Sequence, residues 1–347
     1  MATQSVAIST AVPLALQPCK ETETTMEFGH NYASDGREVP AFLRLKDAAA
    51  GFRSLDTRMG ADETANHHMV VAQVHALLAA IVELENAGVE KSAIHAAVAE
   101  VRQMHAHSPI IARMQSWPRG YAGDYETIEA ILSGQCISPR GTLAYHLERY
   151  VLDCPASQQH RNKVAAQADL IRATIARNPS AAILVVACGS CPDLRLLHDE
   201  LQSFQGQLWL NDIDKGALDR SAAMIKASVT QVQSAPGNVV ELLRESKSLP
   251  KFDLIVAGGL FDYLEDRVAR FVIKGAFACL TARGRFFFTN IGKNPYRPWM
   301  EYCGEWFLRE RDATGLRSLA IQSGVPTEQV RLSTDTTGLT HLVEVVK

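Results

Sequence analysis

Hydrophobic positions in the first half of the chain recur at helical spacing. Apolar residues follow one another at steps of three and four over residues 66–84, and a second run of this kind covers residues 92–105. Shorter helical patterns cover residues 128–132, 142–152 and 158–176, and Asn178-Pro179 interrupts the last one. This periodicity is typical of amphipathic α-helices. It predicts a helical region that extends to about residue 178.

The pattern changes after residue 180, where short apolar segments begin to alternate with helical ones. The run Ile183-Leu184-Val185-Val186-Ala187 is what a strand buried on both faces requires. Such alternation predicts a mostly parallel α/β sheet, and a turn-rich link before the last segment predicts an antiparallel edge. The seven strands are expected at residues 183–187, 207–211, 230–232, 252–257, 284–289, 329–332 and 339–345.

These patterns divide the chain into three parts. Residues 1–25 are rich in Ser, Thr, Pro and Ala without a sustained period, and we expect a disordered tail there. Residues 26–178 are expected to form an N-terminal helical domain, and residues 179–347 an α/β domain. The apolar stripes of the helices are expected to pack on the α/β domain or on a second copy, so homodimer formation is left open.

Composition narrows the function. The 347 residues carry 35 Lys and Arg against 38 Asp and Glu, without a basic run, which argues against nucleic acid as a partner. We find no stretch of about 18 uncharged apolar residues and therefore expect no integral membrane contact. The apolar stretch at residues 6–16 does not resemble a signal peptide. A cytoplasmic protein with reduced thiols is the expectation.

Open parallel sheets bind ligands beyond the carboxyl ends of their strands, so the strand ends are the first candidates for a site. The first strand leads into Cys188-Gly189-Ser190-Cys191, where Gly189 permits close approach of a ligand to the backbone. Asp212 follows the second strand, 23 residues after Gly189 (212 − 189). A carboxylate at that position can accept both hydroxyls of a ribose. A simple turn or helix-cap role for Asp212 is the alternative.

With these features, residues 180–347 resemble class I S-adenosylmethionine methyltransferases. The resemblance implies a Rossmann-like sheet of seven strands, S-adenosylmethionine as cofactor and S-adenosylhomocysteine as product. The glycine-containing loop departs from the usual pattern, because Ala187 and Cys191 stand where glycines are common. The cofactor contacts that the resemblance implies are Cys188 and Gly189 for methionine, Asp212 for ribose, Ile213, Asn238 and Val239 for adenine, and Gly258 and Asp262 near the methyl donor.

Residues 119–126 and 294–302 are similar to segments of the bacterial methyltransferases that make 3-hydroxypalmitic acid methyl ester. In that type, the helical part helps to close the cofactor pocket. Tyr121 would then cover the cofactor, and Arg161 would be a counter-ion for the cofactor carboxylate. The alternatives are that Tyr121 only packs the two domains together and that Arg161 is an exposed helical residue.

The expected reaction is methyl transfer to a small molecule, and the acceptor decides which residues matter. A carboxylate acceptor needs orientation more than a base, and Tyr296, Arg297 and Arg119 are candidates for holding it. An amine or guanidinium needs a carboxylate to hold the cation, which Glu301 and Glu310 could supply. Tyr125 and Trp306 are further candidates for substrate contacts, although aromatic residues near Trp306 are equally suited to a core.

Two other classes of protein stay open. The spacing of Cys188 and Cys191 also fits a redox pair before a helix, and a noncatalytic cofactor-binding module would share the same fold. A zinc site is not expected, because no second Cys or His pair has matching spacing. The histidines of the N-terminal half are expected to be solvated or to pack between helices.

Overall fold

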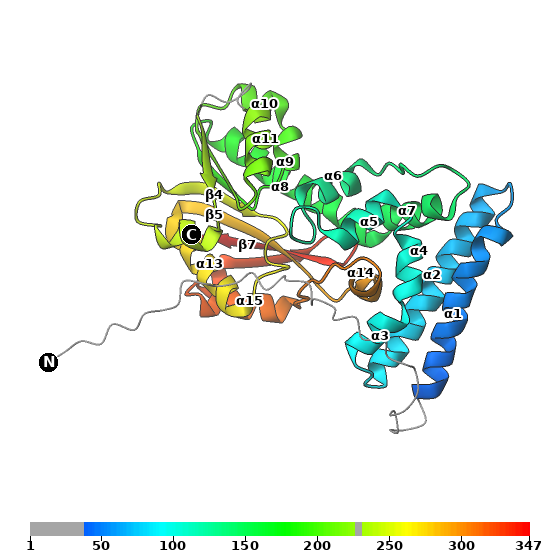
Figure 1. Ribbon diagram of the computed structural model, residues 1–347. Coiled ribbons are helices and arrows are strands. Elements are labelled where there is room, and N and C mark those ends of the chain that lie inside the picture. The colour runs from blue at the N-terminus through cyan, green and yellow to red at the C-terminus, as the bar shows by residue number, and fades with distance from the viewer. Residues whose placement is uncertain (1–37, 226–230) are drawn as a thin grey trace, which may run out of the picture.

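The computed structural model describes residues 38–225 and 231–347, so the predicted tail at residues 1–25 lies outside the described residues. Figure 1 shows a group of helices beside an α/β part that contains one sheet. The helices before the sheet are α1 (Glu38–Arg58), α2 (Glu63–Asn86), α3 (Lys91–Ala97), α4 (Ala99–His105), α5 (Pro109–Ser116), α6 (Tyr125–Ser133), α7 (Leu143–Asp153) and α8 (Pro155–Arg177).

The sheet has seven strands in the order β3-β2-β1-β4-β5-β7-β6. All neighbouring pairs from β3 to β5 are parallel, whereas β7 runs antiparallel to both β5 and β6. The fold class that the sequence predicts is therefore confirmed. The strands are β1 (Ala182–Val186), β2 (Gln207–Asp212), β3 (Val232–Pro236), β4 (Phe252–Ala257), β5 (Leu280–Ile291), β6 (Val330–Thr334) and β7 (Thr340–Val346).

Helices cover both faces of the sheet, which explains why the central strand β1 is apolar throughout. Ile183 and Val185 of β1 pack on one face with α8 and the short helices that follow it, whereas Leu184 and Val186 pack on the other face. The remaining helices are α9 (Pro192–Arg195), α10 (His198–Gln202), α11 (Lys215–Ile225), α12 (Val239–Arg244), α13 (Asp266–Cys279), α14 (Arg297–Tyr302), α15 (Ala313–Gln322) and the 3₁₀ turn η1 (Thr327–Gln329).

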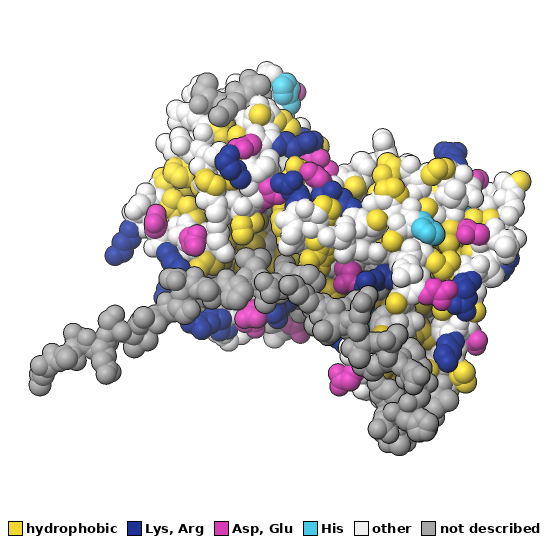
Figure 2. Space-filling model, in the orientation of Figure 1, with side chains coloured by type: hydrophobic (Ala, Val, Ile, Leu, Met, Phe, Trp, Pro, Cys, Tyr) yellow, Lys and Arg dark blue, Asp and Glu magenta, His cyan; other side chains and the backbone are white. Residues whose placement is uncertain are grey.

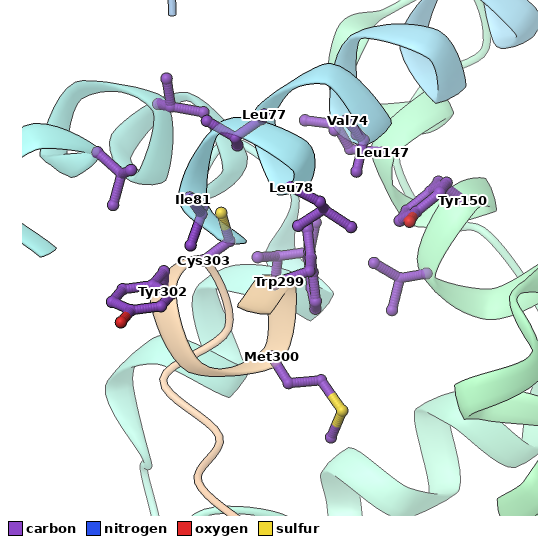
Figure 3. Close-up of a cluster of buried hydrophobic side chains, with 14 of the residues drawn as sticks. Val74, Leu77, Leu78, Ile81, Leu147, Tyr150, Trp299, Met300, Tyr302 and Cys303 are labelled. Atoms are coloured by element: carbon purple, nitrogen blue, oxygen red, sulfur yellow. The ribbon is translucent and has the colours of Figure 1, made fainter. Parts of the chain in front are cut away.

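Two helices connect the helical part to the sheet. The second half of α8 packs into the core of the α/β part through Ala168, Ile171 and Ile175. Helix α14 follows β5 in the chain but packs into the helical part, where Trp299 and Met300 join the same core as Leu77 of α2 (Figure 3). The predicted boundary near residue 178 thus marks where the helical pattern of the sequence ends. It does not separate the two cores in space, because α8 and α14 join them.

Helix α2 is long and apolar enough to pass a composition test for a membrane-crossing helix, with a mean hydropathy of 1.4 over 18 residues, and buried core helices also pass this test. It is not a run of 18 uncharged apolar residues, because Asn, His, Gln and Glu interrupt it. One face of α2 is buried, including Val70, Val74, Leu77 and Leu84, as in a core helix.

Charges of both signs are spread over the surface. On the face shown in Figure 2, basic and acidic side chains lie interspersed and also meet where the helical part joins the α/β part. Arg195 and Arg220 both pair with Glu129 of α6, at 3.0 and 3.2 Å. These exposed ion pairs link α6 to the region around α9 and α11, so the helical part is fastened to the α/β part on this side.

Candidate active site

A cleft of about 850 Å³ opens at the carboxyl ends of β1, β2 and β4. The order of the strands reverses between β1 and β4, and open α/β sheets bind ligands in the crevice at such a point. The other wall of the cleft is formed by α8 and by residues 118–123, which precede α6. The volume is in the range of small-molecule sites.

The turn after β1 presents its backbone to the cleft. Ala187, Gly189 and Cys191 have φ values of +47°, +52° and +50°, so the chain turns sharply at three alternate residues. A Cβ on Gly189 would lie 3.3 Å from the Cβ of Tyr125, and glycine therefore leaves room for the helical part to approach. Cys188 and Gly189 both line the cleft, as expected from the sequence.

Asp212 is the last residue of β2 and is 6% exposed. Its carboxylate accepts the N–H groups of Gly189 and Asp214, both at 2.8 Å. Burial raises the pKa of Asp212 above its ordinary value, and these hydrogen bonds act in the opposite direction. The neighbouring side chain of Ile213 is 56% exposed at the cleft. A buried carboxylate beside an exposed apolar side chain suits the sugar and the base of a nucleoside.

Residues 118–126 reach from the helical part to the end of β2. The guanidinium of Arg119 pairs with both carboxylate oxygens of Asp214, one of them at 2.5 Å, which holds the pKa of Asp214 below its ordinary value. Tyr121 donates its hydroxyl to Asp214 at 3.3 Å, and Arg119 lies 4.8 Å from the ring centroid of Tyr125. Burial and nearby carboxylates raise the pKa of Tyr121. This loop is therefore fastened beside Asp212, where it narrows the cleft.

The residues expected after β3 and β4 also line the cleft. Asn238 caps α12 by accepting the N–H of Val240 at 2.8 Å, and Val239 is buried at the cleft wall. The absence of a side chain at Gly258 makes room for Gln167 of α8, since a Cβ there would lie 2.3 Å from the Gln167 amide nitrogen. The ends of β3 and β4 thus complete the floor of the cleft with small or apolar groups.

A buried ion pair lies at the cleft wall between α8 and the segment after β4. Lys163 Nζ is 3.4 Å from Asp262 Oδ2, and the two side chains are 5% and 3% exposed. The second oxygen of Asp262 accepts the N–H of Ile291 at 2.6 Å. Burial raises the pKa of Asp262, whereas Lys163 acts to lower it. Because the contact between Lys163 and Asp262 is long, the ammonium of Lys163 can also donate a hydrogen bond to an anionic group of a ligand in the cleft.

Helix α8 contributes cleft residues that the sequence analysis did not assign. His160, Lys163 and Gln167 are buried polar residues on one face of α8 and line the cleft. Their spacing of three and four residues was the available signal, because polar groups rarely occupy the buried face of a helix without a role. Arg161 points elsewhere: its guanidinium donates to backbone carbonyls in α6 and α7 at 2.9 and 2.8 Å. The structure therefore brings Lys163, rather than Arg161, to the cleft.

Aromatic side chains close the inner end of the cleft. Trp306 donates its indole N–H to the hydroxyl of Tyr263 at 2.8 Å, and the ring of His160 stacks on Trp306 with centroids 5.5 Å apart. Gly123, at φ +67°, permits this arrangement, since a Cβ would lie 2.4 Å from the Tyr263 hydroxyl. Trp306 is buried and lines the cleft, so its position is compatible with both predicted roles, a substrate contact and a core residue.

Four predicted acceptor residues lie outside the cleft. Arg297 pairs with Glu85 of α2 at 2.9 Å and with Glu301 at 3.1 Å, and Glu301 also pairs with a lysine of α3 at 2.9 Å. Glu310 accepts a backbone N–H at 2.9 Å, and burial raises its pKa. Tyr296 lines a second, apolar pocket behind Trp306. The structure thus separates Glu301 and Glu310 from the cleft and places Arg297 in a contact between helices.

The two cysteines after β1 are both buried, with exposures of 7% for Cys188 and 0% for Cys191. They are free thiols. Contact with the Cys191 thiol and burial raise the pKa of Cys188 well above its ordinary value. Reactive redox cysteines instead have a lowered pKa and are accessible to solvent. This environment gives the redox alternative no support.

No protein-family model and no curated protein matches the chain. Among solved structures, a possible exported protein from Bordetella parapertussis has 14% identity, with a TM-score of 0.54 over 88% of this chain and 96% of that one. Magnesium protoporphyrin IX methyltransferase from Synechocystis PCC 6803, with bound SAH, has 14% identity and a TM-score of 0.42, covering 55% and 87%. A SAM-dependent methyltransferase from Archaeoglobus fulgidus has 11% identity and a TM-score of 0.38, covering 52% and 94%. At these identities the similarity concerns the fold alone.

Proposed function

We propose that this chain is an S-adenosylmethionine-dependent methyltransferase that acts on a small molecule. The observation that carries the proposal is the position of Asp212. Its buried carboxylate ends β2 inside a cleft at the point where the strand order reverses, and the backbone turn after β1 lies directly against it. A nucleoside cofactor is the ligand class that this arrangement fits best.

We assign each part of the cofactor to its own group of residues in the cleft. Asp212 would accept the ribose hydroxyls, and the exposed Ile213 would contact adenine together with Asn238 and Val239. The backbone at Cys188, Gly189 and Gly258 would surround the methionine part, and Tyr121 would cover the cofactor. We assign the methionine carboxylate to Lys163, which Asp262 holds in place.

When bound, the cofactor supplies a methyl group that its sulfonium already activates. The contribution of the protein is then to orient the acceptor and exclude water. Orientation of this kind supplies about 7–11 kcal/mol in well-aligned systems. The aromatic wall of Trp306 and Tyr263 supports this role, because Trp306 is buried, Tyr263 is half-buried, and both line the cleft.

For the acceptor we propose an oxygen nucleophile, either a carboxylate, as in the methyl ester-forming enzymes that the sequence resembles, or a hydroxyl. An amine or guanidinium acceptor needs a carboxylate to hold its cation, and the predicted carboxylates form a pair. Glu301 and Glu310, the candidates for that pair, do not line the cleft. Their hydrogen bonds to groups of the protein support a structural role instead.

Calorimetric titration with S-adenosylhomocysteine tests the cofactor assignment. Hydrogen bonds from two ribose hydroxyls to a charged carboxylate are worth about 3 kcal/mol or more together, so Asp212→Ala should weaken binding by roughly 150-fold. Asp199→Ala is the matched control, because Asp199 is an exposed aspartate of α10 that does not line the cleft. Absence of micromolar binding by the unmodified chain would favour the noncatalytic alternative.

Transfer of a labelled methyl group to pooled hydroxy fatty acids, phenols, amino acids and guanidines tests the acceptor class. Label released by mild base identifies a methyl ester, and label that resists base but is found on oxygen identifies an ether. Label on nitrogen would contradict the oxygen assignment. A cytoplasmic location and homodimer formation stay predictions, and light scattering of the purified chain tests the second.

A further inference from the structure

A small apolar pocket lies behind the inner wall of the cleft. Its volume is about 30 Å³, room for roughly one small alkyl group, since a water molecule needs about 10–15 Å³ by the same measure. The pocket lies between α7, α8 and α14, and Figure 3 shows Tyr150 of α7 on the side of α14 that carries Trp299 and Met300. His160 and Trp306 line both the pocket and the cleft, so these two rings are all that the two spaces share.

The wall of the pocket includes two buried polar atoms without a partner. Within residues 38–225 and 231–347, neither the Tyr150 hydroxyl nor the Trp299 indole nitrogen has a hydrogen-bond partner. An unsatisfied buried group of this kind costs about 1–3 kcal/mol. Both groups are donors that have no partner in the described structure, so an alkyl group that fills the pocket breaks no hydrogen bond.

His160 has the properties of a base at the junction of the two spaces. It is 8% exposed, and burial together with the nearby charges of Lys163 and Arg161 lowers its pKa well below the ordinary value. The ring is therefore neutral at pH 7, with one nitrogen free to accept a proton. No side-chain hydrogen bond of the described residues involves the ring of His160, whereas its face is held by stacking on Trp306.

The charges of the cleft argue for an acceptor without a charge. A carboxylate acceptor would need a cation, and the cations that line the cleft are Arg119, Lys163 and Lys215. Arg119 is paired with Asp214, Lys215 is paired with Asp219, and Lys163 is the residue that we assign to the methionine carboxylate. A neutral hydroxyl needs no counter-ion, but it does need a base.

We propose that the methyl acceptor is a small hydroxyl compound, a phenol or an alcohol, whose apolar end enters the pocket and whose hydroxyl donates its proton to His160. The proposal rests on the proposed methyl transfer. As the hydroxyl proton passes to the free ring nitrogen of His160, an electron pair of the oxygen forms the bond to the methyl carbon. The bond between that carbon and sulfur breaks, its electron pair stays on sulfur, and the sulfonium becomes a neutral thioether.

The first test removes the base and keeps its size. His160→Gln should lower kcat for methylation of phenol, 4-methylphenol or 1-butanol by about 10²- to 10⁴-fold, the usual contribution of a general base. The dissociation constant of S-adenosylhomocysteine should stay within about 3-fold, or roughly 0.6 kcal/mol. His107→Gln is the matched control, because His107 is exposed and lines neither space.

The second test fills the pocket and measures binding without turnover. Ala156 lines the pocket, whereas Ala165 lies on an exposed position of the same helix. Titration of 4-methylphenol into the complex with S-adenosylhomocysteine should show at least 10-fold weaker binding for Ala156→Val than for Ala165→Val. Binding of S-adenosylhomocysteine itself should be the same in both variants and shows that each is folded.

The outcomes distinguish a failure of the proposed methyl transfer from a failure of the proposed hydroxyl acceptor. If the chain does not bind S-adenosylhomocysteine, the proposed function itself fails. If it binds S-adenosylhomocysteine but neither binds nor methylates any of the three hydroxyl probes, or if its product is a base-labile ester, the hydroxyl proposal is overturned while methyl transfer stands. Unchanged kcat in His160→Gln overturns the role of His160.

Discussion

The pair of Lys163 and Asp262 gives the sharpest test of how the cleft is built, because one substitution affects stability and binding through different partners. Lys163→Met removes the ammonium and leaves the buried carboxylate of Asp262 without its ion-pair partner. Removing one partner of a buried ion pair costs about 3–5 kcal/mol. Because the contact is long, at 3.4 Å, we expect a loss near the lower end of that range. The exposed Lys274 supplies the control variant, Lys274→Met.

The pH dependence follows from the sign of the pKa shift. The pKa of Asp262 is already raised by burial in the folded state, and Lys163 opposes this shift. An acid whose pKa is raised on folding loses stability as the pH rises through that raised pKa, because the folded protein must then hold an unfavourable charge. Lys163→Met raises the pKa further, so urea unfolding should show a larger deficit at pH 8 than at pH 5.

A double variant separates stability from binding. In Lys163→Met with Asp262→Asn, the amide oxygen still accepts the N–H of Ile291, and no uncompensated charge is left. We expect the free energy of unfolding to return to within about 1 kcal/mol of the unmodified chain, since replacing both partners is often close to neutral. Affinity for S-adenosylhomocysteine should stay low by about 10- to 150-fold, the value of a hydrogen bond between charged groups.

Two results would refute this reasoning. If the double variant recovers affinity together with stability, Lys163 acts on the ligand only through the fold. If Lys163→Met binds S-adenosylhomocysteine as tightly as Lys274→Met does, the methionine carboxylate is held by another group. Urea unfolding at two pH values and calorimetry on four proteins are sufficient to distinguish these cases.

Three further substitutions test other parts of the site. Tyr150→Phe removes a buried hydroxyl that has no partner in the described structure, so thermal unfolding should show equal or higher stability. The KM for 4-methylphenol should not rise, because the pocket takes the apolar end of the acceptor. Arg119→Gln breaks the contact to Asp214, and stopped-flow measurement should show faster release of S-adenosylhomocysteine with a change in unfolding free energy of less than about 1 kcal/mol. Gly123→Ala forces a Cβ against Tyr263 at a left-handed residue and should cost about 1–3 kcal/mol in urea unfolding; an unchanged midpoint would contradict the packing described here.

The sheet was predictable because its signals are local. The central strands β1 and β4 are mainly apolar, and the two-sided burial of β1 is visible in its uninterrupted apolar residues. Asp212 and Gly189 were also predictable, since they follow strands and such positions converge at one edge of the sheet. Helix α1 was not predicted. Gly51 lowers its helix propensity, and the end of the Gln73 side chain of α2 lies where a Cβ of residue 51 would be, with its amide oxygen 2.3 Å from that position.

The roles of residues in long-range contacts were the least predictable. Arg297 and Glu301 carry the right chemistry for a site, but Glu85, more than 200 positions earlier in the chain, recruits Arg297 into an ion pair. No local pattern predicts that pairing. Lys163 and His160 had a usable signal, the polar face of α8, although the resemblance directed attention to Arg161 instead. The strand ends pointed to the cleft, whereas the polar face of α8 was a signal that stayed unused.

The wall formed by His160 and Trp306 separates the residues that would bind the cofactor from those that would bind the acceptor. The groups that would grip the nucleoside belong mainly to the sheet, whereas most of the small pocket is made by α5 to α8 and α14. Replacing side chains around that pocket would therefore change the acceptor specificity and leave the cofactor-binding site unchanged. Chains with this layout are suited to engineering toward new alcohols by redesigning one compartment at a time.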